Sequence, residues 1–123
     1  MYRIPENLDI KGIIGYDLNL LGLGRYDIQL NFTGSGIKFC IQGNISLLEN
    51  GKVIATWNEE TNWSSLDFQK VLNATVESYA IPNEKLLEIR FDKGLILQIH
   101  DDSDQYEAMQ IYFDDESRSL IVI

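Results

Sequence analysis

The sequence has few of the residues that crosslinking, acid–base catalysis or membrane insertion requires. It contains one cysteine, Cys40, so no internal disulfide can form, and a lone thiol suits a reducing compartment. Its longest purely apolar runs are four residues, such as 120–123, far short of the about 20 residues of a membrane-spanning helix. The N-terminus lacks the basic residues and apolar run of a signal peptide. These absences predict a soluble, cytoplasmic protein that does not associate with membranes.

Basic residues are also scarce. The chain has 10 Lys and Arg against 19 Asp and Glu, and its formal net charge is −9. Most of the imbalance lies in residues 66–123, which hold twelve acids and five bases, with no base between Lys93 and Arg118. Such a surface repels phosphate, so we expect no nucleic-acid binding. It attracts a basic protein and speeds its docking, or it serves solubility alone.

The clearest pattern in the chain is self-similarity at a distance of about 58 residues. Residues 8–15 (LDIKGIIG) match 66–73 (LDFQKVLN), and 37–41 match 95–99 at the same offset. Residues 28–32 match 87–91 at an offset of 59, and the extra residue falls in a turn, where length changes are tolerated. The pattern predicts a single domain, 1–123, built from two tandem units at about 8–65 and about 66–123.

Each unit is expected to begin with a short helix, near residue 8 or residue 66, and to continue in short strands. Apolar Ile28, Leu30 and Phe32 alternate with polar neighbours, which is the period of a half-buried antiparallel strand. Asn50-Gly51 is a strong hairpin signal. The predicted class is α+β, mainly antiparallel β. We expect about ten short strands and two short helices in a curved sheet or partly open barrel.

Residues that could carry catalysis or bind a metal are few. Cys40 lies between two apolar residues of a predicted strand, and a Cys–His pair with His100 would need a shared, exposed face. The acidic run that begins at Asp101 does not fit a calcium-binding loop, because Tyr106 or Glu107 stands where glycine is required. The sequence therefore predicts no catalytic residue, no metal site and no cofactor.

Aromatic residues beside acidic loops give the best candidate surface. In the predicted strand 106–113, Tyr106 and Tyr112 share one face, while Met109, Ile111 and Phe113 point to the core. Exposed aromatic residues bordered by charged residues are typical of protein-binding surfaces. Tyrosine and tryptophan also cover the outside of a hydrophobic core, with their polar ends in water. The residues expected to bind a partner are Asp101, Asp102, Asp104, Tyr106, Glu107, Tyr112, Asp114, Asp115, Glu116, Trp57 and Trp63.

Two short segments resemble the signature of a family of small acidic bacterial β-rich domains. Residues 91–97 (FDKGLIL) resemble F-x-D/N-G-x-x-L, and residues 106–109 (YEAM) resemble Y-E-A/S-W after an acidic loop. Residues 66–73 match the short L-x-x-L-L-G helix of that family. The sequence departs from the pattern at Lys93, which is inserted before the glycine, and at Met109, where an aromatic is usual. Members look like immunity proteins encoded beside secreted toxins, and the family has no established catalytic residues.

The leading prediction is therefore a non-catalytic binding protein of the immunity type. It would neutralise a cognate basic toxin domain, such as a nuclease, by covering its site. The alternative is a small-molecule-binding domain that uses the concave face of the curved sheet. An enzyme is the least favoured class, because the sequence offers no activated nucleophile.

Overall fold

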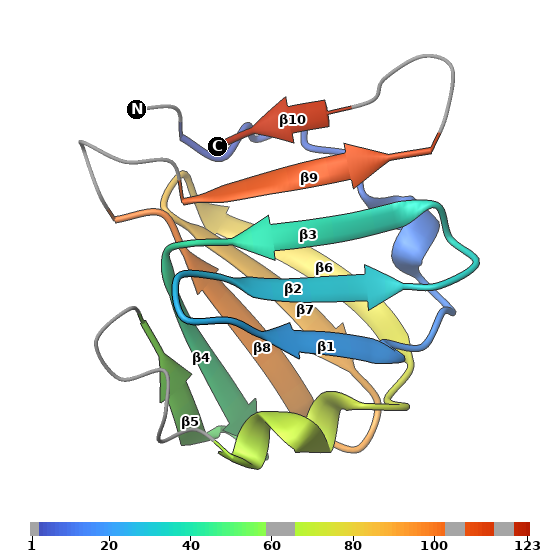
Figure 1. Cartoon of the computed structure of the whole chain (residues 1–123), viewed down its shortest axis with the longest axis vertical. Helices are drawn as coiled ribbons and strands as arrows, with labels where there is room; N and C mark the ends of the chain where they lie inside the picture. The colour runs from blue at the N-terminus through green and yellow to red at the C-terminus, as the bar shows by residue number, and fades with distance from the viewer. Residues whose placement is uncertain (1–2, 59–65, 103–107, 115–119) are drawn as a thin grey trace.

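The protein forms two stacked, five-stranded antiparallel sheets in the computed structural model, which describes residues 3–58, 66–102, 108–114 and 120–123 (Figure 1). The strands are β1 (Leu20–Leu23), β2 (Ile28–Phe32), β3 (Ile37–Ile41), β4 (Asn44–Glu49), β5 (Lys52–Trp57), β6 (Val76–Asn83), β7 (Leu86–Phe91), β8 (Leu95–His100), β9 (Met109–Phe113) and β10 (Leu120–Val122). Two 3-10 helices, η1 (Lys11–Ile13) and η3 (Leu66–Val71), each precede a group of five strands.

Each sheet combines strands from both halves of the chain. The first has the order β1-β2-β3-β9-β10, and the second has the order β5-β4-β8-β7-β6. Three consecutive strands of one half are thus extended by the last two strands of the other half. The joining pairs are β3 with β9 and β4 with β8, both antiparallel. Neither half therefore forms a complete sheet by itself.

The core lies between the two sheets and follows the alternation of the strands. In β2 and β3 every second residue is buried, and the same holds for β7 and β8. Phe32 and Phe39 meet edge to face at a ring-centroid distance of 5.9 Å and an angle of 71°. The inward residues of both sheets belong to one cluster of buried side chains. The strand period read from the sequence thus places these core residues correctly.

Residues 15–18 and 73–76 cross next to each other and pair reciprocally. Asp17 and Thr75, which are 58 residues apart, form an antiparallel bridge, and the Thr75 hydroxyl donates to the Asp17 carboxylate at 2.5 Å. Four backbone hydrogen bonds flank this bridge: Gly15 N to Val76 O, Leu18 N to Ala74 O, Asn73 N to Leu18 O and Val76 N to Tyr16 O. Each hydrogen bond donated by one segment has a counterpart that the other segment donates from the equivalent position, 58 residues away in the chain. The junction therefore ties the beginnings of the two groups of strands together.

The predicted mainly antiparallel β class is confirmed, and the described strands do not close into a barrel. The described residues form two separate sheets, because the chain leaves the first sheet after β3 through Gln42 and Gly43 and starts β4 in the second. Between η1 and β2 only 20–23 is a strand, because Gly15, at φ +88°, turns the chain and residues 16–18 pair with 74–76.

No helix among the described residues has the length and apolar character needed to cross a membrane.

Burial predicts the effect of truncating core side chains. Phe39 is 1% exposed at the centre of the first sheet, whereas Val53, on the edge strand β5, is 52% exposed. We expect Phe39→Ala to lower the free energy of unfolding by about 3–5 kcal/mol, because it leaves a cavity. Val53→Ala should change it by less than about 0.5 kcal/mol. Urea denaturation of both variants measures these values, and equal losses would contradict the assignment of the core.

Candidate binding surface on the outer face of the first sheet

Tyr112 lies on the outer face of the first sheet, on the strand β9. Strand register places it beside Lys38 of β3, and Lys38 lies beside Asn31 of β2. The same row reaches Leu20 on the edge strand β1 and Leu120 on the edge strand β10. Leu20 is 58% exposed and Leu120 is 46% exposed. The row thus has a polar and aromatic centre with an exposed leucine at each rim.

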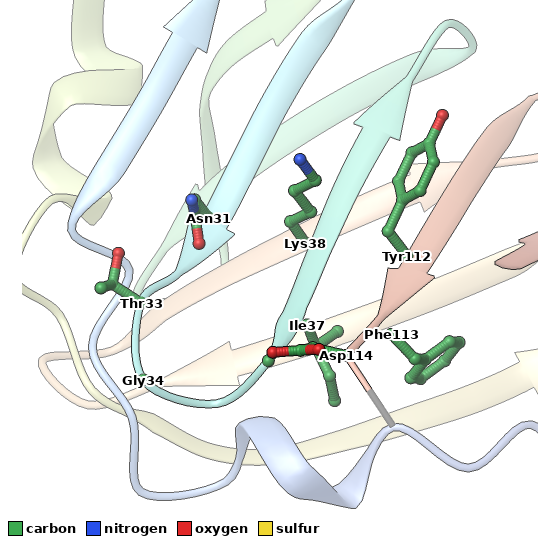
Figure 2. Close-up of a pocket in the computed structure, with 9 residues that line it drawn as sticks. Asn31, Thr33, Gly34, Ile37, Lys38, Tyr112, Phe113 and Asp114 are labelled. Atoms are coloured by element: carbon green, nitrogen blue, oxygen red, sulfur yellow. The ribbon is translucent and has the colours of Figure 1, made fainter. Parts of the chain in front are cut away.

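A hollow of about 410 Å³ lies next to this row, and its lining includes Thr33, Gly36 and Asp114 of the neighbouring row (Figure 2). When the β2–β3 and β3–β9 registers are continued by one residue, Gly36 stands between Thr33 and Asp114, and the Asp114 N–H donates to the Gly36 carbonyl at 2.7 Å. Outward residues of successive rows are separated by about 7 Å along a strand.

Opposite charges border the hollow. The Lys38 ammonium lies 5.5 Å from the centroid of the Tyr112 ring, within the range of a cation–π contact. The Tyr112 hydroxyl donates to Gln110 Oε1 at 2.8 Å, which fixes the ring on the sheet. Within the described ranges, neither Lys38 nor Asp114 forms an ion pair. Figure 2 shows Lys38 and Tyr112 pointing to the same side from neighbouring strands.

Two of the residues expected to bind a partner, Tyr112 and Asp114, line this hollow. Asp102 is also exposed, but it follows β8 of the second sheet, where the Asn44 side chain of β4 donates to its carboxylate at 2.9 Å. Asp102 does not line the hollow.

Trp57 was expected to be an apolar anchor for a partner, and this is wrong. Its side chain is fully buried, because it lies opposite the inward-facing Ile45 at the end of β5. Within the described structure its indole Nε1 has no hydrogen-bond partner. Trp57 therefore contributes to the core and not to the surface.

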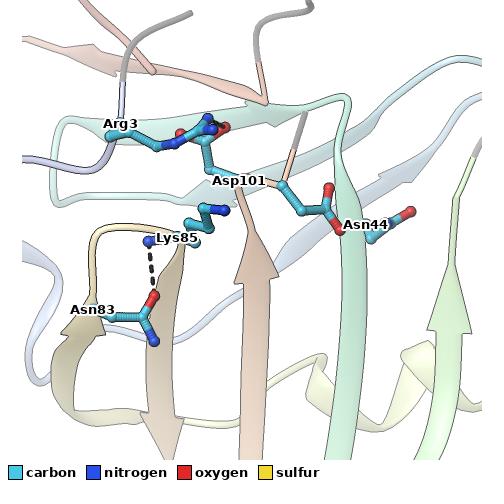
Figure 3. Close-up of polar contacts among 6 residues, drawn as sticks. Arg3, Asn44, Asn83, Lys85 and Asp101 are labelled. Atoms are coloured by element: carbon cyan, nitrogen blue, oxygen red, sulfur yellow. Dashed lines mark hydrogen bonds and ion pairs between the residues drawn. The ribbon is translucent and has the colours of Figure 1, made fainter. Parts of the chain in front are cut away.

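Asp101 was expected on an exposed acidic loop and is instead buried. The inward alternation of Leu97 and Ile99 continues past β8, so the Asp101 side chain also points inward and is 0% exposed. Its Oδ1 accepts a hydrogen bond from Arg3 Nη1 at 3.3 Å, and its backbone N–H donates to the Lys85 carbonyl (Figure 3). Its Oδ2 has no partner in the described structure. Asp101 thus anchors the N-terminal segment beside β8.

The remaining expected partner residues lie outside the described residues. They are Trp63, Asp104, Tyr106, Glu107, Asp115 and Glu116.

Sequence reasoning missed Lys38, Asn31 and Thr33 as surface residues of one site. Their outward position follows from the alternation of β2 and β3, which was recognised. Their assembly beside Tyr112 depends on the pairing of β3 with β9, about seventy residues later in the chain, and no local pattern encodes that pairing. Gly36, within a glycine-rich turn, was the available signal for the hollow.

The single thiol is unsuited to nucleophilic chemistry. Cys40 is half-buried on β3, and its Sγ–H donates to Asp27 Oδ2 at 3.1 Å. Burial, helped by this hydrogen bond and by the negative charge of Asp27, raises the pKa of the Cys40 thiol to about 11.

The described residues contain no group of three or more His, Cys, Asp or Glu side chains placed to hold a metal ion. Ser46 Oγ and His100 Nε2 are 3.5 Å apart on the open outer face of the second sheet.

Comparison of the chain with protein-family models, with curated proteins and with solved structures finds no match.

The raised thiol pKa predicts slow alkylation of the native protein. At pH 8 a thiol with a pKa near 11 is roughly one part in a thousand thiolate, whereas a free cysteine is about one-quarter thiolate. Iodoacetamide should therefore modify native Cys40 roughly a hundredfold more slowly than the urea-unfolded protein. Asp27→Asn should speed the native reaction, because it removes the carboxylate that raises the pKa. Equal rates for native and unfolded protein would contradict this assignment.

Burial of Asp101 predicts a specific pH dependence of stability. Burial raises the pKa of the Asp101 carboxyl above its ordinary value, and the Arg3 guanidinium opposes this shift without cancelling it. The folded protein therefore binds a proton at higher pH than the unfolded chain does. The unfolding free energy of the wild type should rise relative to that of Asp101→Asn as pH falls from 7 to about 4.

Urea titrations of the wild type and Asp101→Asn across this pH range measure that difference. Asp67→Asn, at an exposed position of η3, is the control for loss of one carboxylate. A difference between the wild type and Asp101→Asn that stays constant with pH would show that Asp101 does not take up the proton.

Proposed function

We propose that the protein is a non-catalytic binding protein of the immunity type, which neutralises a cognate basic toxin domain by covering its site. The observation that carries this proposal is the position of Tyr112. It lies half-exposed in a five-residue row, between Lys38 at the centre of the row and the exposed Leu120 on the edge strand β10. Tyrosine is enriched among the residues that dominate protein–protein affinity.

Charge and family resemblance support the same proposal. A net charge of −9 attracts a basic partner over long range and accelerates association. Exposed Asp102 follows β8 of the second sheet and exposed Asp114 follows β9 of the first, so they would contact separate parts of a partner. The resemblance of residues 91–97 and 106–109 to small immunity-like domains points to the same class of partner. Occlusion requires no catalytic group on this chain.

We also propose that the two units arose by duplication. The two units are similar in sequence at an offset of 58 residues, and the paired residues Asp17 and Thr75 are separated by the same distance in the chain. The similarity also coincides with matched turns, because Gly36 and Gly94 both have positive φ and both accept a hydrogen bond through their carbonyl oxygens. An exchange of strands between the two units explains why each sheet contains strands of both.

Capture of a partner followed by affinity measurement tests the proposed function. The tagged protein is recovered from its own host with low-salt and then high-salt washes, and bound proteins are identified by mass spectrometry. One stoichiometric basic partner is expected. Tyr112→Ala should then weaken its binding by at least roughly tenfold, as central aromatic residues of interfaces do.

The matched control is Tyr26→Ala, since Tyr26 is 55% exposed beyond the opposite end of β2. Asp102→Lys with Asp114→Lys should slow association and reduce its salt dependence, because steering charges are lost. Absence of a stoichiometric basic partner would contradict the immunity proposal. Equal affinity of the Tyr112 and Tyr26 variants would exclude the outer face as the interface.

A further inference from the structure

We propose that the hollow above Gly36 is a binding site for a free α-amino acid, held through its ammonium and its carboxylate. The juxtaposition behind this proposal is a cation, Lys38, and an anion, Asp114, which stand on neighbouring rows of one sheet face and line the same hollow. The proposal does not depend on a protein partner, because it concerns a small ligand and the binding of that ligand can be measured on the isolated chain.

The floor and walls of the hollow are fixed by the sheet. Ile37 and Phe113, which pair across β3 and β9, are buried beneath it. Thr33 and Asp114 flank Gly36 on either side, and Lys38 follows on the same strand. Regular strand pairing holds β3 and β9, so these walls are set by main-chain hydrogen bonds. A volume of about 410 Å³ accommodates a ligand of amino-acid size.

The two charges select a zwitterion. Lys38 offers an ammonium to a ligand carboxylate, and Asp114 offers a carboxylate to a ligand ammonium. A ligand with only a carboxylate would leave Asp114 repelling it in a protein of net charge −9. A ligand with only an ammonium would meet the like charge of Lys38. The Thr33 hydroxyl and Asn31 amide lie at the same hollow for further hydrogen bonds.

The Tyr112 ring supplies the apolar part of the site. Its hydroxyl is already engaged by Gln110 at 2.8 Å, so the ring keeps its position whether or not the hollow is occupied. The Lys38 ammonium lies near this ring, at 5.5 Å from the centroid. The side chain of the amino acid would lie against the ring face.

The second sheet provides an internal comparison. Its β8–β4 pair corresponds in register to β3–β9, so that Gly94 stands where Gly36 does and Ile96 where Lys38 does. There Asn50, the counterpart of Asp114, places its amide oxygen where a Cβ of Gly94 would lie, and at Gly36 the Asp114 Cβ lies 3.2 Å from the equivalent position. Ile96 and Asn50 thus stand where the first sheet has Lys38 and Asp114, so the second sheet carries neither charge at this place.

Amide chemical shifts of ¹⁵N-labelled protein test the proposal. The full chain is titrated with a panel of the proteinogenic L-amino acids, and the backbone amides of Gly34, Gly36 and Lys38 are followed. At least one amino acid should shift these three amides in a saturable manner. Its decarboxylated analogue, an amine, and its deaminated analogue, a carboxylic acid, should each bind at least roughly tenfold more weakly, because each loses one charge-assisted contact.

Two pairs of variants complete the test. Lys38→Gln and Asp114→Asn should each weaken binding of the amino acid by roughly tenfold or more. Lys52→Gln on β5 and Asp67→Asn on η3 make the same changes of charge at exposed positions elsewhere and should leave the affinity unchanged. The proposal is overturned if no amino acid shifts the three amides. It is equally overturned if both analogues bind as tightly as the amino acid, or if the Lys38 and Asp114 variants bind like their controls.

Discussion

The pairing of β3 with β9 and of β4 with β8 is the constraint on which the rest of the structure depends. Each pair joins strands from different halves of the chain, and both pairs are antiparallel and in regular register. Without them each sheet would lose two of its five strands, and the inward faces of the remaining three would be left partly uncovered. Since hydrophobic burial is the main favourable term in folding, the two halves stabilise each other through these pairs.

The same pairing creates the candidate surface. Asn31 and Lys38 belong to the first half of the chain, whereas Tyr112 and Asp114 belong to the second, and β3–β9 register places them on one face. The inner faces of both sheets are filled by core side chains, and the hollow that Tyr112 and Asp114 line is on the outer face. Paired strands hold the residues of such a site in fixed positions.

Some acidic residues have partners within the protein, whereas others are exposed on the surface. Asp101 is buried against Arg3, Asp17 bonds to Thr75 at the junction, and Asp27 holds the Cys40 thiol in its protonated form. Asp114 is exposed at the hollow without an ion pair in the described structure. Some of the acidic residues therefore stabilise the fold through contacts within the chain. The net charge of the chain thus does not equal the charge that a partner would contact.

Local sequence patterns predicted most of the strands, their inward residues and the turns, because alternation and glycine positions act over a few residues. They also pointed to Tyr112 and Asp114 as surface residues. That the strands form two sheets, and that Trp57 and Asp101 are buried, follows from long-range pairing. It alone brought Lys38 beside Tyr112. These outcomes depend on pairing between residues far apart in the chain, which local patterns do not encode.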